Sequence, residues 1–243
     1  MGKHEGSPTG MGPLSALALV ILSFILSQFA LAVLLQLWAS VVGKNVQSVL
    51  DDASIGVQLL LSVLVYVFIA GILFWFMRCS GKNFKDLGFK KPQAKIIAYV
   101  LSGFAIYFVG LLVVQSVVMR IFPSYNIDQA QETGYENVQG IAQIVLAFAG
   151  LVIIPPIVEE FIFRGFLYQS LTSKWPKKWA AVITSALFAL AHGQWNVAVD
   201  TFILSLVLIY LLEKTQNIWA SIGLHALKNS IAFLFLLHTA GVF

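Results

Sequence analysis

Long apolar stretches alternate with short polar ones along almost the whole chain. Residues 14–42, 55–77 and 96–119 contain no Asp, Glu, Lys, Arg or His, and each is longer than the roughly 18 residues that indicate a membrane-spanning helix. Further apolar stretches follow at 139–170, 178–194, 197–213 and 217–238. The pattern predicts an all-α, polytopic membrane bundle of about seven transmembrane helices, or eight if the last stretch breaks into two pieces.

The composition agrees, and the charged residues lie mostly between the predicted helices. Hydrophobic residues make up 59% of the 243 residues and charged residues 11%, whereas soluble domains carry about 25% charged residues. Lysine-rich loops at 78–95 and 174–178 account for much of the net charge of +4. The acidic loop residues are Asp51, Asp52, Asp128, Glu132 and Glu136. By the positive-inside rule, the lysine-rich loops and the N-terminus with Lys3 are cytoplasmic, so the basic charge indicates membrane orientation and no nucleic-acid partner.

Ionisable residues inside the apolar stretches are concentrated in the second half of the chain. They are Glu159, Glu160, Arg164, His192, Asp200, His225, Lys228 and His238. Charged groups are costly at membrane depth and mark functional sites by default. We therefore divide the single predicted membrane domain into N-terminal helices and loops at 1–138 and a functional core at 139–243.

The stretch IIPPIVEEFIFRGF, at 153–166, combines adjacent prolines with two acids and an arginine. Proline donates no backbone hydrogen bond, so carbonyl groups near 150–152 lose their helical partners and need others from protein or water. The sequence predicts a polar cavity in the membrane beside the two acids.

The two acids of this stretch have different surroundings on a helix. Glu160 and Arg164 are four residues apart and can form an ion pair on one face, which predicts a structural pair. Glu159 lies about 100° around the helix and lacks that cation. We therefore predict that Glu159 is the general base.

Two later apolar stretches each contribute polar groups at the same spacing. Phe188 and His192 stand in FALAH, and His225 and Asn229 stand in HALKN. A carboxylate and an imidazole can deprotonate a water, while a second imidazole and an amide stabilise the oxyanion. Alternatively, Glu159, His192 and His225 could ligate Zn²⁺ and leave a position for water. Either arrangement predicts hydrolysis, most naturally of a peptide bond.

Together, EExxxR, FxxxH and HxxxN on successive apolar stretches resemble the motifs of the CPBP family. This family contains CAAX proteases and bacteriocin-processing enzymes, with the Rce1 endopeptidase and the Abi proteins among them. The resemblance covers about residues 139–235. It implies that Glu159 and His192 activate the water, that His225 and Asn229 support the oxyanion, and that Glu160 and Arg164 form a structural pair. It leaves the metal open; three potential ligands on three separate helices favour a metal-independent reaction.

The resemblance also implies a substrate class and a location. We expect an intramembrane endopeptidase of a bacterial cytoplasmic membrane that cleaves hydrophobic or membrane-anchored peptides or proteins. The alternative is a non-catalytic membrane scaffold or immunity protein of the same superfamily. A proton-coupled transporter is disfavoured because no internal repeat accompanies the polar helices.

Two ionisable residues have no place in this motif set. Lys228 precedes Asn229, and we expect it to face away from His225. Asp200 lies near the expected start of an apolar stretch, where we expect it to cap a helix.

Overall fold

The computed structural model describes residues 7–126, 133–135 and 138–242, and its secondary structure is entirely helical. The helices are α1 (Pro13–Val42), α2 (Val46–Asp51), α3 (Ile55–Cys79), α4 (Ile96–Ile121), α5 (Gly140–Phe148), α6 (Ile154–Glu160), α7 (Gln169–Thr172), α8 (Lys177–Leu190), α9 (Trp195–Thr215) and α10 (Ile218–Thr239). Two π-helical segments, η1 (Ala149–Ile153) and η2 (Phe161–Tyr168), join α5, α6 and α7 into one continuous helix. Lys3, Asp128, Glu132 and Glu136 lie outside the described residues.

Six of these helices are long and apolar enough to cross a membrane: α1, α3, α4, the continuous helix Gly140–Thr172, α9 and α10. The prediction of a polytopic helical bundle is therefore confirmed. The one predicted stretch missing from this set, 178–194, forms α8, but this helix has only 14 residues. It stops because residues 191–193 form a turn in which Gly193 has φ +71°. The last stretch is one unbroken helix of 22 residues, so an eighth helix is absent from the described part of the chain.

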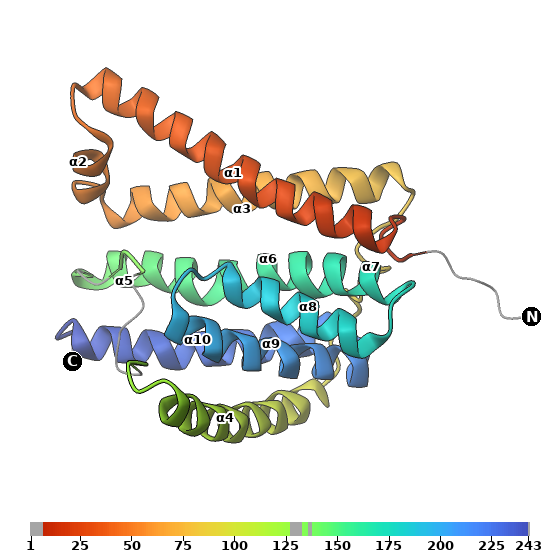
Figure 1. Ribbon diagram of the computed structural model, residues 1–243. Coiled ribbons are helices and arrows are strands. Elements are labelled where there is room, and N and C mark those ends of the chain that lie inside the picture. The colour runs from red at the N-terminus through yellow and green to blue at the C-terminus, as the bar shows by residue number, and fades with distance from the viewer. Residues whose placement is uncertain (1–6, 127–132, 136–137, 243) are drawn as a thin grey trace, which may run out of the picture.

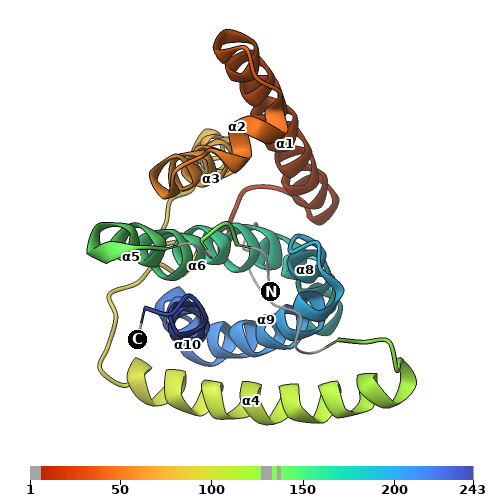
Figure 2. The same ribbon diagram turned by 90° about the vertical axis from the view of Figure 1, so that its left-hand side faces the viewer.

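Most of the long helices run roughly along a common direction (Figure 1). A hairpin of α1 and α3 lies on one side, and α4 crosses the opposite side over α9 and α10. The continuous helix Gly140–Thr172 and α8 lie between these two outer parts (Figure 2). Helices α1, α3 and α4 each carry many exposed apolar side chains, as expected for helices that face lipid.

The lysine-rich loop between α3 and α4 is fastened to the ends of two other helices. Gln169 Nε2 donates to the Leu87 carbonyl at 2.9 Å, and the Ile218 amide donates to the Gly88 carbonyl at 3.0 Å. On the same end of the bundle, the hydroxyls of Thr9 and Ser170 share a buried hydrogen bond of 2.6 Å. The described N-terminal residues and the basic loops thus lie together, and the described C-terminal end of α10 lies at the opposite end (Figure 1).

Candidate active site

A cavity of about 450 Å³ lies among α1, α3, the continuous helix and α8–α10. Its polar lining includes the predicted site residues Glu159, His192, His225 and Asn229. These residues come from α6, the turn after α8, and α10. The structure therefore brings four predicted residues from three separate segments to one cavity.

Next to this cavity, a buried polar network joins Glu160 to two partners, Arg164 and His225. Arg164 Nη1 donates to Glu160 Oε1 at 3.0 Å, and both side chains are fully buried. His225 Nδ1 lies 3.0 Å from the same oxygen. The guanidinium Cζ also lies 4.3 Å from the centroid of the Phe188 ring, a cation–π distance. The pair predicted from the four-residue spacing is present, and it also holds one edge of the His225 imidazole.

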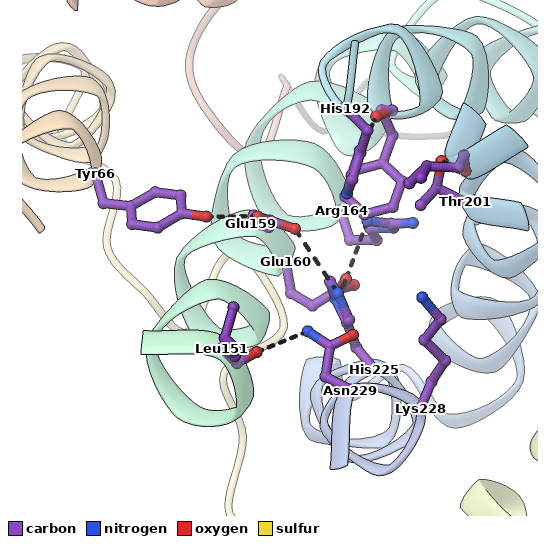
Figure 3. A network of polar contacts seen from close by, with 12 residues as sticks. Tyr66, Leu151, Glu159, Glu160, Arg164, His192, Thr201, His225, Lys228 and Asn229 are labelled. Atoms are coloured by element: carbon purple, nitrogen blue, oxygen red, sulfur yellow. Dashed lines mark hydrogen bonds and ion pairs between the residues drawn. The ribbon is translucent and has the colours of Figure 1, made fainter. Parts of the chain in front are cut away.

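Glu159 lies on the cavity side of this network and is partly exposed, at 14% of its side chain. Its Oε1 accepts a 2.6 Å hydrogen bond from the Tyr66 hydroxyl, and its Oε2 lies 3.7 Å from His225 Nε2 (Figure 3). Tyr66 is in α3, so the first half of the chain also contributes to the site. The imidazole of His225 thus stands between the two adjacent acids, with one nitrogen toward each.

Tyr66 was not among the predicted site residues, although the sequence contains a local signal for it. Gln58, Ser62 and Tyr66 are spaced four residues apart and form a polar stripe on one face of an otherwise apolar helix. Ser62 and Tyr66 both line the cavity. A polar stripe on an apolar transmembrane helix indicates an inward face, so this spacing would have pointed to the site.

We expect Tyr66→Phe to slow turnover about 10- to 10²-fold if Glu159 is the base. The phenylalanine ring keeps the packing but removes a hydrogen bond to a charged group, which is worth about 1.5–3 kcal/mol. The rate of peptide cleavage by purified protein measures this effect. Leu60→Ala, at an exposed position of the same helix, is the control, and equal rates for wild type and Tyr66→Phe would contradict the assignment.

The two prolines explain the position of Asn229. The Leu151 carbonyl cannot accept a helical hydrogen bond from either Pro155 or Pro156, because neither residue has an N–H. Asn229 Nδ2 from α10 donates to this carbonyl at 2.9 Å instead (Figure 3). The predicted loss of partners near 150–152 is thereby confirmed at Leu151, and the partner is a site residue.

We expect Asn229→Ala to destabilise the protein by about 1–3 kcal/mol, because it leaves a carbonyl without a partner. Thermal unfolding in detergent measures the change. Ser230→Ala removes a neighbouring hydroxyl that donates to the Ala226 carbonyl of its own helix, and serves as the control. If Asn229→Ala unfolds at the wild-type temperature, the hydrogen bond to Leu151 is not structural.

His192 lies just beyond α8 and not inside a helix, which differs from the predicted span 178–194. Its Nδ1 is 2.8 Å from the Phe188 carbonyl. The fully buried Phe188 ring packs against both imidazoles, with centroid distances of 4.9 Å to His192 and 5.7 Å to His225. Phe188 therefore separates and orients the two imidazoles.

The expectations for Lys228 and Asp200 were both wrong. Lys228 lines the same cavity as His225, because three residues along a helix turn the side chain by only about 60° from the same direction. Its Nζ lies 3.0 Å from Asp200 Oδ2. Asp200 is in the second turn of α9, which begins at Trp195, so it does not cap the helix. It also accepts a hydrogen bond from the Tyr107 hydroxyl of α4.

The zinc alternative requires Glu159, His192 and His225 to converge on one point. Among the described residues, no three His, Cys, Asp or Glu side chains are grouped in a way that could hold a metal ion. His225 and His192 each hydrogen-bond through Nδ1, to Glu160 and to the Phe188 carbonyl, which leaves both Nε2 atoms for other partners. In the described structure the three predicted ligands therefore fail to converge, although the hydrogen bonds of the two imidazoles are of the kind that zinc ligands make.

The helices and this cavity define a multi-pass membrane protein with a carboxylate- and imidazole-lined site within the bundle. Residues 141–231, which contain all three motifs, match the family described as Rce1-like, type II CAAX prenyl endopeptidase. The predicted resemblance to CAAX proteases is thereby confirmed.

Similar proteins from bacteria agree with this match. The chain is 26% identical over 232 residues to the membrane-embedded CAAX protease MroQ of Staphylococcus aureus, covering 93% of this chain and 90% of that protein. It is 23% identical over 219 residues to YdiL of Bacillus subtilis, a presumed membrane peptidase, covering 88% and 86%. No solved structure matches the chain.

Proposed function

We propose that the protein is an intramembrane endopeptidase in which Glu159 is the general base that activates the hydrolytic water. The observation that carries the proposal is the position of Glu159 at the cavity surface, between the Tyr66 hydroxyl and His225 Nε2. The similarity to proteins named as membrane peptidases supports the reaction class.

The distance between Glu159 and His225 suits a shared water. At 3.7 Å, Oε2 and Nε2 are too far apart for a direct hydrogen bond. One water at about 2.8 Å from each atom lies within hydrogen-bonding reach of both. Tyr66 occupies the other oxygen of Glu159 and fixes the rotation of the carboxylate.

In this mechanism the water oxygen attacks the carbonyl carbon of the substrate peptide bond, and one water proton passes to Glu159. The electron pair of the carbonyl double bond moves to oxygen and forms an oxyanion. When the tetrahedral intermediate collapses, the C–N bond breaks, and Glu159 returns its proton to the departing amine. His225 orients the water, and His192 lines the same cavity.

This assignment moves the role of orienting the water from His192 to His225. His225, and not His192, is the imidazole next to Glu159. We propose that Glu160 and Arg164 keep His225 in place, and that Asn229 supports the site by holding the Leu151 carbonyl.

A cavity within apolar helices suits a hydrophobic or membrane-anchored peptide or protein as substrate. The bacterial relatives favour a bacterial cytoplasmic membrane. The lysine-rich loops lie at the same end as the described N-terminal residues, which supports a cytoplasmic N-terminus.

The test is a comparison of peptides and shed fragments from cells that carry the wild-type protein or Glu159→Gln, by mass spectrometry. We expect specific fragments to disappear with the variant while the protein remains in the membrane. Identical fragment sets and an unchanged cell phenotype would favour the non-catalytic scaffold, and the missing termini would otherwise identify the substrate.

A further inference from the structure

We propose that Lys228 stabilises the oxyanion of the tetrahedral intermediate, and so is a further catalytic residue. The inference rests on the proposed function and adds a group that lies outside the three motifs. The oxyanion needs a cavity group that can donate a hydrogen bond to its developing negative charge.

The two imidazoles are poorly placed to be that donor in their neutral form. His225 Nδ1 faces the carboxylate of Glu160, and His192 Nδ1 faces the Phe188 carbonyl. A backbone carbonyl accepts hydrogen bonds, and so does the carboxylate of Glu160 when it is ionised in its pair with Arg164. Each Nδ1 therefore carries the hydrogen. The remaining Nε2 of each neutral ring is then an acceptor, which suits binding of water and not stabilisation of an oxyanion.

The amide of Asn229 is also partly committed. Its Nδ2 donates to the Leu151 carbonyl, which has no helical partner because of the two prolines. Rotating the amide toward an oxyanion would break this hydrogen bond. Asn229 is therefore better suited to hold the backbone than to follow a charge that forms during the reaction.

Lys228 carries donors and a full positive charge into the same cavity. It lies one turn from His225 on α10, and its side chain extends beside that imidazole (Figure 3). The ammonium has three hydrogens, and Asp200 is its one ion-pair partner among the described residues. Hydrogens remain for an oxygen of the substrate.

Asp200 and Tyr107 explain how this ammonium is kept at membrane depth. Lys228 and Asp200 have side-chain exposures of only 18% and 19%, and their 3.0 Å contact compensates both charges. Tyr107, which is itself buried, fixes Asp200 through a hydrogen bond from α4. The ammonium is therefore held in position before any negative charge forms, as electrostatic stabilisation of a transition state requires.

The test measures kcat and KM of purified wild type and variants on the peptide identified by the fragment comparison. We expect Lys228→Met to lower kcat about 10²–10³-fold, as for loss of an oxyanion donor, with KM changed less than about threefold. Lys228→Arg keeps the charge and should recover at least about tenfold of that loss. Lys44→Met removes an ion-paired lysine on the exposed loop beyond α1 and should leave both constants unchanged.

A second variant separates catalysis from folding. Lys228→Met leaves Asp200 without its cation, so Asp200→Asn combined with Lys228→Met removes both charges and should restore thermal stability. We expect the double variant to remain as slow as Lys228→Met alone. Recovery of wild-type kcat in the double variant would show that the ion pair is only structural.

The outcomes distinguish the two proposals. If Glu159→Gln abolishes cleavage but Lys228→Met keeps the wild-type kcat, the inference about Lys228 is wrong and the proposed function stands. If wild type releases no fragments and cleaves none of a library of hydrophobic peptides in proteoliposomes, the proposed function is wrong, and the catalytic role of Lys228 falls with it.

Discussion

Glu159→Gln should lower the rate of peptide cleavage by purified protein about 10³-fold or more. The substitution keeps the size of the side chain and its contact with the Tyr66 hydroxyl, but an amide cannot accept a proton from water. Loss of a positioned general base costs about 10²–10⁴-fold. Because the Glu160–Arg164 pair is untouched, the variant should fold and unfold like wild type.

The matched control for this prediction is Glu213→Gln. Glu213 lies near the C-terminal end of α9, at the end of the bundle where the basic loops lie. It forms an ion pair with Lys177 and accepts a hydrogen bond from the Tyr168 hydroxyl. The same chemical change there should leave the cleavage rate within about twofold of wild type. Cleavage by Glu159→Gln at a tenth of the wild-type rate or faster would exclude Glu159 as the base.

The helices could be predicted well because their signal is local. Uninterrupted apolar stretches predicted the starts of α1, α3 and α4 to within a residue. The predicted length of α8 was wrong, because the helix ends at Leu190, before Gly193 adopts a positive φ. An apolar stretch continues through that turn, so hydrophobicity alone does not reveal it.

The candidate site was predictable where the contacts lie within one helix and not where they cross between helices. The Glu160–Arg164 contact follows from a four-residue spacing. The contact of Tyr66 with Glu159 spans 93 positions along the chain, and that of Lys228 with Asp200 joins two helices. Such contacts depend on helix packing, which a single apolar pattern does not specify. The carbonyl without a partner was foreseeable from the prolines, but its partner Asn229 was not.

The second large effect concerns Glu160, whose negative charge supports two neighbours at once. Glu160→Gln should destabilise the protein by about 3–5 kcal/mol, because it leaves the fully buried Arg164 without a counter-charge. Lower yield from the membrane and a lower unfolding temperature in detergent measure this. The loss arises from the uncompensated cation, so it should not depend on the presence of substrate.

A double variant, Glu160→Gln with Arg164→Met, tests that reasoning. It removes both buried charges, and replacing an entire buried ion pair is often neutral for stability. The glutamine oxygen can still accept the hydrogen of His225 Nδ1, which lies 3.0 Å from Glu160 Oε1. We therefore expect the double variant to regain most of the stability lost by Glu160→Gln and to keep measurable cleavage. A double variant as unstable as the single one would show that the charge of Glu160 holds His225 itself, and that the pair with Arg164 is secondary.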